Sequence, residues 1–472
     1  MATGRNIDIA AVIDDAPISS LQRKAIGICL VLAVLDGFDA TLMGFVIPAL
    51  SEDWGVEPAS FALTLTVSTG SMVLGSLLFG PVADRYGRRI TTVLCTAIFA
   101  VFTLATVFAA DMTTLMILRA FAGLGLGGVL PNLIALSSEY SPARARATVV
   151  TIVVAGMNLG AFVAGFVASA VIPAFGWRAM FVIGGVLPLV MAAAALRFLP
   201  ESVRFLSLRG DNTRAAILLG AIDPSAGVTT EDRFVSTDTR VKKSPIGALF
   251  ERGRLAETLV LWGVFVINFL VIYFLLSWMP SLFTQAGLGS SVSLVAASLF
   301  SLGGMTGALT IGWITDRIGN AFLTVMGGYA LGAIFVIVTA LVVGTGSAVL
   351  VFAAIFVVGF GMSGSSAGII ALAATVYPVE VRATGVGWAV GVGRIGSIIG
   401  PGIGGLLIAS GLGAMSIFTV MVIPHTRRRD AARCACLSQS RMDRGCGYAL
   451  AGAGLCRAGG NSKDLSFGPA IA

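Results

Sequence analysis

The sequence predicts an all-α polytopic membrane protein built from two six-helix halves. Only 12% of its 472 residues are charged and 56% are hydrophobic, with a mean hydropathy of +0.93. A water-soluble globular protein carries about 25% charged residues, because its surface must be solvated. The 59 glycines suit helices that pack closely in lipid. A motif that occurs once in each half of the chain indicates the duplication.

Eleven apolar segments are long enough to span a bilayer, which takes about 20 helical residues. A twelfth segment begins near Ala414 but meets Pro424 and three arginines after about 11 residues, too few to span. We therefore expect an incomplete twelfth span. The eleven predicted spans are 25–50, 60–82, 90–109, 114–136, 148–171, 178–198, 257–282, 291–314, 321–342, 348–373 and 384–409.

Basic residues gather in alternate loops, which predicts the orientation. Lys and Arg concentrate in cytoplasmic loops of membrane proteins. The loops after the even-numbered spans contain arginines or lysines, whereas the loops after spans 1, 3, 7 and 9 contain none. Arg178 alone departs from this pattern. The pattern predicts a multi-pass protein of the cytoplasmic (inner) membrane, surrounded by the lipid bilayer, with a cytoplasmic N-terminus.

Two motifs recur at nearly the same distance along the chain. Gly80–Gly87 reads GPVADRYG and Gly312–Gly319 reads GWITDRIG, 232 residues later. Pro142–Thr148 and Pro378–Thr384 both read P-x-x-x-R-A-T, 236 residues apart. Matched motifs at matched spans predict a parallel repeat related by a pseudo-two-fold axis. Such halves enclose a site near the midplane and rock against each other.

The motif residues at the cytoplasmic ends of the spans are expected to form a conformational latch rather than a substrate site. Glycine permits a tight turn there, and the charges can tie a loop to helix ends. We expect Glu139 and Glu380, which lie beside basic residues, to form gate ion pairs, with a direct part in coupling as the alternative. The other latch candidates are Gly80, Asp84, Arg85, Gly87, Arg88, Arg89, Asp316, Arg317 and Arg382.

Asp36 and Asp39 lie three residues apart within the first span, on one face of the predicted helix. Ionisable side chains inside a membrane are costly and usually functional. Burial and a neighbouring acid both oppose ionisation of a carboxyl group. One of the two is therefore expected to hold a proton and to release it when access changes. A structural salt bridge to another helix is the alternative.

Arg119 in the fourth span and Arg394 in the eleventh are candidates for balancing a carboxylate, either of a substrate or of the aspartate pair. A guanidinium group stays charged and can hold a carboxylate with two hydrogen bonds. Arg119 could instead anchor a helix end. Possible cavity-lining residues, with packing or interfacial positions as the alternative, are Phe38, Asn132, Asn158, Asn268, Tyr273, Trp278 and Trp388.

No pattern indicates catalysis, a cofactor or a metal site. His425 is the only histidine, and no phosphate-binding loop with a preceding strand occurs. The net charge of +7 does not indicate nucleic acid, because the segment after residue 424 alone carries +5. We expect transport driven by a gradient rather than by ATP, carried out by a functional monomer.

The segment after residue 424 changes abruptly to Arg, Cys, Gly and Ser. We hypothesise that it results from a frameshift, and resequencing of the locus tests this, since an unbroken frame in independent reads contradicts it. The expected parts are a cytoplasmic N-terminal segment (1–24), an N-terminal bundle (25–198), a cytoplasmic central loop (199–256), a C-terminal bundle (257–424) and this aberrant basic tail (425–472).

The motifs resemble those of a known family. GPVADRYGRR is similar to the signature between helices 2 and 3 of the major facilitator superfamily, and Pro200–Arg204 (PESVR) to its box after helix 6. Asp36–Asp39 (DGFD) resembles the hallmark of the aromatic acid/proton symporter family, in which charged residues at positions matching Arg119 and Arg394 are needed for transport. The resemblance covers about residues 20–424 and implies the major facilitator fold.

The function that this resemblance implies is import of a small aromatic carboxylate, such as a hydroxybenzoate, together with a proton. The alternatives are a facilitator for another organic acid or a sugar, and a membrane sensor that does not transport. Competition by benzoates and measurement of flux distinguish them.

Overall fold

The computed structural model describes residues 5–235, 246–250, 255–378 and 381–411. The predicted twelfth span, the tail and Glu380 lie outside these ranges. Helices dominate the described chain, and ten of them are long and apolar enough to cross a membrane.

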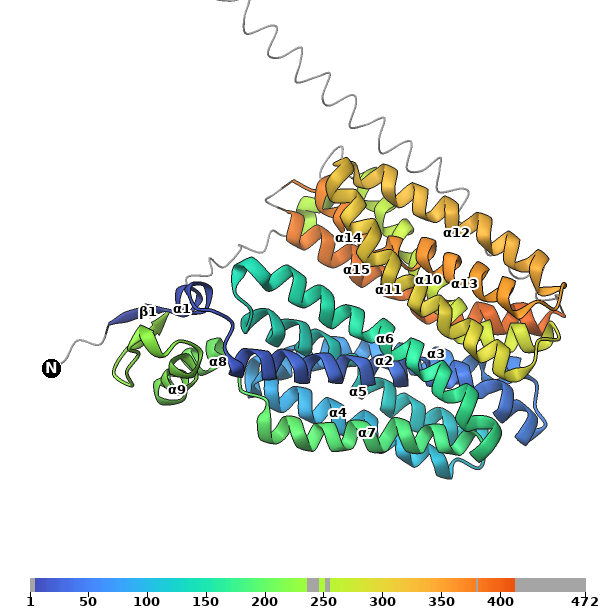
Figure 1. The fold of residues 1–472 in the computed structure, drawn as a ribbon, viewed down its shortest axis with the longest axis horizontal. Helices are drawn as coiled ribbons and strands as arrows, with labels where there is room; N and C mark the ends of the chain where they lie inside the picture. The colour runs from blue at the N-terminus through green and yellow to red at the C-terminus, as the bar shows by residue number, and fades with distance from the viewer. Residues whose placement is uncertain (1–4, 236–245, 251–254, 379–380, 412–472) are drawn as a thin grey trace, which may run out of the picture. The chain divides into compact units, whose positions relative to one another are not determined.

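The six spans of the N-terminal half each form one helix, close to the predicted ranges (Figure 1). Short 3-10 turns, η1 (Pro58–Phe61) and η2 (Thr106–Phe108), lead into α3 and out of α4. The N-terminal helices are α2 (Ser20–Trp54), α3 (Ala62–Tyr86), α4 (Arg88–Ala105), α5 (Met112–Glu139), α6 (Ala143–Phe175) and α7 (Trp177–Phe198).

The C-terminal half contributes α10 (Leu255–Gln285), α11 (Ser290–Ile318), α12 (Ala321–Val343), α13 (Ala348–Met362), α14 (Ser365–Val376) and α15 (Arg382–Ala409). The predicted single span 348–373 is divided between α13 and α14. The Gly364 N–H bonds to the carbonyl oxygen of Gly359, five residues back, which widens the turn. A Cβ atom on Gly364 would lie 2.7 Å from the backbone of Gly307. The break therefore occurs where α11 approaches closely.

The same packing pairs recur in the two halves. In the N-terminal half α2 packs on α6 and α3 on α5, and in the C-terminal half α10 packs on α15 and α11 on α13. Contacts between the halves are also paired, since α3 meets α15 while α6 meets α11, and α2 meets α10. This arrangement is the predicted parallel repeat of two bundles.

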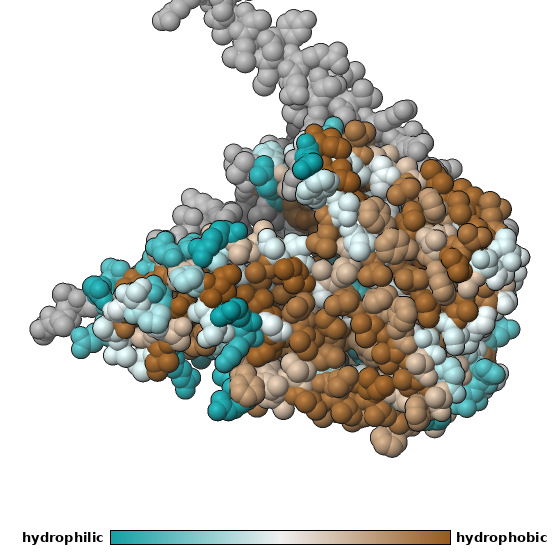
Figure 2. Space-filling model, in the orientation of Figure 1, coloured by the Kyte–Doolittle hydropathy of each residue, from teal (hydrophilic) through white to brown (hydrophobic). Residues whose placement is uncertain are grey.

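The side chains on the outer faces of the spans are largely apolar. Figure 2 shows apolar residues across the helices of the bundles and hydrophilic residues around α1 and α9 and at the opposite helix ends. Leu77, Val190 and Leu341 are more than half exposed. Large apolar side chains cannot cover so much surface in water without favouring association, and a lipid environment removes that cost.

The N-terminal segment and the central loop, predicted as separate parts, pack together at the end of the N-terminal bundle. Strand β1 (Asn6–Asp8) pairs in parallel with β2 (Arg233–Val235), with Ile7 opposite Phe234. Helix α1 (Ile9–Asp15) packs on α9 (Asn212–Ile222), and α8 (Val203–Leu208) also contacts α9. The Asp14 carboxylate accepts a hydrogen bond from the Ala143 N–H at the start of α6. Two further 3-10 turns complete the elements, η3 (Pro224–Ala226) and η4 (Ile246–Phe250).

Candidate functional site

Asp39, Thr103 and Arg119 form a buried polar cluster between α2, α4 and α5. The Thr103 hydroxyl donates to Asp39 Oδ1 at 2.7 Å, and Arg119 Nη2 donates to Thr103 Oγ1 at 2.5 Å. Arg119 Nη1 lies 3.6 Å from Asp39 Oδ2, and both side chains are closed to solvent. The guanidinium also lies 5.4 Å from the Phe181 ring centroid. The low dielectric around this pair strengthens its attraction.

Gly37, a residue of α2 itself, sets how closely this helix packs on α6. A Cβ atom on Gly37 would lie 1.9 Å from the Met157 carbonyl oxygen, so that face of α2 lies directly on α6. Asp39 lies two residues along, toward α4, α5 and Gly184 of α7. The close packing on α6 therefore holds the carboxylate toward the interior of the N-terminal bundle.

Asp36 is completely buried, and neither of its carboxylate oxygens has a hydrogen-bond partner among the described residues. Asp39, three residues further along α2, is buried as well. A buried carboxylate without hydrogen bonds is costly when it is charged, so the neutral acid fits this environment. The two aspartates, alike in sequence, thus occupy different environments.

Arg394 of α15 lies beside two aromatic residues of α10. Its Nη1 donates to the Tyr273 hydroxyl at 3.4 Å, and its guanidinium carbon lies 5.5 Å from the Phe269 ring centroid. The side chain is partly buried, and no carboxylate of the described residues forms an ion pair with it. Arg394 is therefore a cation whose charge is not balanced by a direct partner there.

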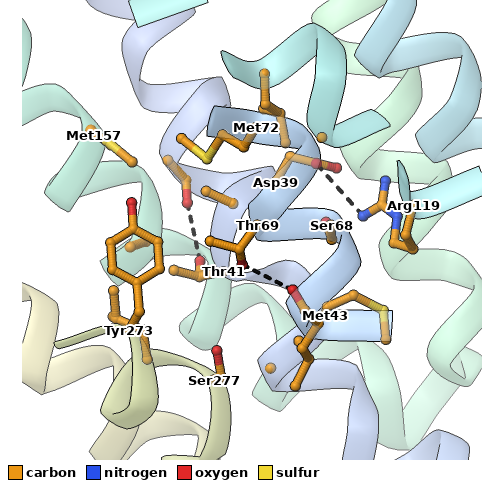
Figure 3. Close-up of a pocket in the computed structure, with 18 of the residues that line it drawn as sticks. Asp39, Thr41, Met43, Ser68, Thr69, Met72, Arg119, Met157, Tyr273 and Ser277 are labelled. Carbon is orange, nitrogen blue, oxygen red and sulfur yellow. Dashed lines mark hydrogen bonds and ion pairs between the residues drawn. The ribbon is translucent and has the colours of Figure 1, made fainter. Parts of the chain in front are cut away.

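A cavity of about 80 Å³ lies between the halves. Asp39 and Arg119 lie on its wall, and Tyr273 and Ser277 of α10 line it from the C-terminal half (Figure 3). Arg119 Nε is buried without an acceptor among the described residues. The rest of the wall is Gly37, Ala40, Thr41, Met43, Gly44, Leu65, Ser68, Thr69, Met72, Gly123, Leu126, Met157, Asn158, Ala161 and Leu276.

The predicted latch residues of the N-terminal half contact acids outside their own loop. Arg88 Nε lies 3.0 Å from Glu139 Oε1, which joins the start of α4 to the end of α5. The Arg89 N–H donates to Glu201 Oε1 at 3.0 Å, and Arg89 Nη2 donates to the Leu196 carbonyl oxygen. Gly87 has φ +102°, and a Cβ atom there would collide with the Glu201 carboxylate.

The contacts of the remaining latch candidates involve backbone carbonyl groups and aromatic rings rather than acids. The Arg85 carbonyl oxygen accepts a hydrogen bond from Arg209, while the Arg85 guanidinium lies over the Tyr86 ring. Arg317 lies over Trp313, 4.2 Å from the ring centroid, and Arg382 Nε donates to the Tyr377 carbonyl oxygen at 3.4 Å. Gly80 lies in α3 and Asp84 is exposed near its end, while Asp316 lies near the end of α11.

The family model of the Major Facilitator Superfamily matches residues 29–401. The chain belongs to the major facilitator superfamily. It is similar to the 4-hydroxybenzoate transporter PcaK of Acinetobacter baylyi, with 36% identity covering 90% of this chain and 93% of that protein. A gallate transporter of Pseudomonas putida is 36% identical, covering 89% and 92% of the two chains. The benzoate transport protein of Acinetobacter baylyi is 30% identical, covering 84% and 85%.

A solved structure shares the fold of this superfamily member. The bacterial homologue of the human lysosomal transporter Spinster, inward-facing and unoccupied, aligns with a TM-score of 0.64 at 16% identity, covering 89% of this chain and 97% of that one. The predicted fold class is thus confirmed, and the protein is a multi-pass membrane transporter rather than an enzyme.

Of the possible cavity-lining residues, Asn158 and Tyr273 line the pocket of this transporter. Phe38 is buried in the apolar core, and the Asn132 amide donates to the Gly128 carbonyl oxygen of its own helix. Asn268 joins Tyr329 and Ser366 within the C-terminal bundle. Trp278 donates to the Pro401 carbonyl oxygen, and Trp388 stacks on Trp262 with 42% of its surface exposed.

Sequence reasoning did not single out Thr103, Glu201, Ser68 or Ser277 as site residues. Serines and threonines in apolar helices usually bond to their own backbone, as Thr92 and Thr106 do, so type alone does not mark Thr103. Glu201 belongs to the PESVR box, and its place in that box was the available signal.

Proposed function

We propose that this transporter imports a small aromatic carboxylate together with a proton across the cytoplasmic (inner) membrane, as a functional monomer with a cytoplasmic N-terminus. The observation that carries the proposal is the pocket between the halves, with a buried carboxylate–guanidinium pair on its wall. Relatives that match almost the whole chain carry names for 4-hydroxybenzoate, gallate and benzoate transport.

Arg119 and Arg394 are the cations that would balance the substrate carboxylate in this proposal. Arg119 lies on the pocket wall, and its Nε is free to donate. Arg394 acts from behind the wall through the Tyr273 hydroxyl. A substrate anion that approaches Arg119 competes with Asp39 for the same guanidinium, so binding and protonation of the aspartates become linked.

Asp36 and Asp39 would carry the proton. Asp36 has no hydrogen bond to stabilise its charged form, whereas Asp39 is held by Thr103 and Arg119. We therefore assign the proton to Asp36 when the pocket is empty. The bound substrate weakens the ion pair between Arg119 and Asp39. Less positive charge then acts on the two aspartates, so the proton is more strongly retained while the halves change access.

The apolar part of the pocket suits an aromatic ring. Three methionines, Met43, Met72 and Met157, line it together with Tyr273. Thioether groups adapt to irregular shapes and pack favourably against aromatic rings. The proposed latch at Arg88, Glu139 and Glu201 would close the predicted cytoplasmic end while the opposite end is open.

Uptake of labelled 4-hydroxybenzoate and protocatechuate by cells that express the chain tests this proposal. We expect accumulation that a protonophore abolishes and that unlabelled benzoates compete away. Competition by aliphatic acids or sugars, but not by benzoates, would instead support the alternative of another organic solute. Ligand binding without any flux would support a membrane sensor.

A further inference from the structure

The polar groups on the pocket wall divide into two classes. The Thr41 hydroxyl donates to the Gly37 carbonyl oxygen at 3.1 Å, and the Thr69 hydroxyl donates to the Leu65 carbonyl oxygen at 2.9 Å, so both are used by their own helices. Ser68, Asn158 and Ser277 make no side-chain hydrogen bond to any described residue, yet all three line the pocket and are partly exposed. These three groups are available to a ligand.

The free groups lie at different positions relative to the charged pair. A Cβ atom on Gly123, one turn after Arg119, would lie 3.4 Å from Ser68 Oγ, so Ser68 is on the charged side of the pocket. Ser277 comes from the other half of the protein, where the backbone of α10 packs on Gly44. Figure 3 shows Ser68 beside Arg119 and Ser277 on the side of Tyr273.

We propose that Ser277 binds a ring hydroxyl group of the substrate, placed para to a carboxylate held at Arg119 and Ser68. This inference rests on the proposed function, and it narrows the substrate class to 4-hydroxylated aromatic acids. Tyr273 and Ser277 are four residues apart and share one face of α10. A carboxylate and a para hydroxyl group lie at opposite ends of a ring. The charged pair and Ser277 likewise belong to parts of the wall that come from the two different halves of the protein.

The apolar residues of the wall offer no hydrogen-bond partner to a hydroxyl group. They include Met43, Met72, Leu126 and Leu276. When an unsubstituted benzoate is bound, the Ser277 hydroxyl has only water as a hydrogen-bond partner. A neutral hydrogen bond in a partly wet site changes affinity by roughly fivefold to tenfold.

Binding of benzoate, 2-hydroxybenzoate and 4-hydroxybenzoate to the purified full-length chain tests the inference. For the unmodified protein we expect 4-hydroxybenzoate to bind roughly tenfold tighter than benzoate. In Ser277→Ala that ratio falls to near one, while the ratio of 2-hydroxybenzoate to benzoate does not change. Thr284→Val is the matched control, because the Thr284 hydroxyl lies on the same helix, outside the pocket, and bonds to Pro280.

Two results overturn the inference: an unchanged preference for 4-hydroxybenzoate in Ser277→Ala, or equal affinities in the unmodified protein. Ser277→Cys keeps the shape of the side chain at a slightly larger volume and has a weaker donor. It therefore serves as the second variant if the alanine variant fails to fold, with the same expected loss of preference. Absence of binding by all three acids contradicts the proposed function itself, which separates that failure from a failure of the hydroxyl assignment.

Discussion

Asp39 and Arg119 form an ion pair in which both side chains are closed to solvent, with 3.6 Å between Oδ2 and Nη1. Thr103 connects them through a second route, since it donates to Asp39 and accepts from Arg119. Removing one partner of a buried pair leaves the other charge without compensation, which is far more costly than losing an exposed pair.

We therefore expect Asp39→Asn to abolish uptake and to destabilise the protein by about 3–5 kcal/mol. Thermal unfolding in detergent, beside uptake by cells with matched surface expression, measures both effects. Asp53→Asn is the control, because Asp53 pairs with Arg178 at 3.5 Å while both side chains are about half exposed. Asp53→Asn should lower the free energy of unfolding by about 1 kcal/mol or less. Equal effects of the two substitutions would contradict the importance of the buried pair.

Arg394 is expected to affect substrate affinity more than stability. Arg394→Gln should raise KM at least tenfold, since it removes a positive charge whose field favours an anion in the pocket. Tyr273→Phe, which removes the hydroxyl that accepts from Arg394, should raise KM severalfold. Concentration-dependent uptake, with unfolding temperature as a check, gives these values. An Arg394→Gln protein with unchanged KM would show that Arg394 only packs against Phe269.

The Arg88–Glu139 pair is expected to hold the predicted cytoplasmic end closed. Its side chains are 26% and 20% exposed, so we expect the contact to contribute about 1 kcal/mol or less. Breaking this ion pair should then raise the fraction of molecules whose pocket is open to the predicted cytoplasmic end by roughly twofold to fivefold. Thiol labelling of a Thr69→Cys reporter in the pocket, with and without Glu139→Gln, measures this population. Unchanged labelling rates would speak against a latch at this pair.

The contacts of Asp232 predict that the stability of the junction between the N-terminal segment and the central loop depends on pH. The Thr229 N–H and the Arg5 guanidinium hold the pKa of this carboxyl well below its ordinary value. A lowered pKa in the folded state adds stability above the unfolded value of about 3.9, and this stability is lost as pH falls below it. Hydrogen exchange in β1, corrected for intrinsic rates, should therefore accelerate below about pH 4.

Asp232→Asn should remove this pH dependence and raise exchange in β1 at neutral pH. Asp223→Asn is the matched control, since the Asp223 carboxylate bonds to Ser225, two residues away. Protection of β1 that stays constant from pH 7 to about pH 3 would refute the assignment to Asp232.

The spans could be predicted because they depend on local apolar length, and the repeat because its motifs recur at matched positions along the chain. The packing of α2 on α6 and of α10 on α15 shows the same repeat in the structure. The division between α13 and α14 was not predicted, because it depends on the approach of Gly307 from another helix.

The site was only partly accessible to sequence reasoning. Charged residues in apolar spans are conspicuous, so Asp36, Asp39, Arg119 and Arg394 could be chosen without a structure. Their partners are not conspicuous: Thr103 lies 64 residues from Asp39 in the chain and 16 from Arg119, and Tyr273 lies 121 from Arg394. The difference between an unpartnered Asp36 and a paired Asp39 arises from tertiary packing alone.

Coupled proton movement in proteoliposomes tests the central claim most directly. An inward gradient of 4-hydroxybenzoate should drive proton uptake by the unmodified chain, reported by an internal pH dye. In Asp36→Asn, a neutral mimic of the protonated acid, exchange of labelled for unlabelled substrate should persist while proton uptake disappears. Proton uptake that persists in Asp36→Asn would contradict the assignment of the transported proton to Asp36.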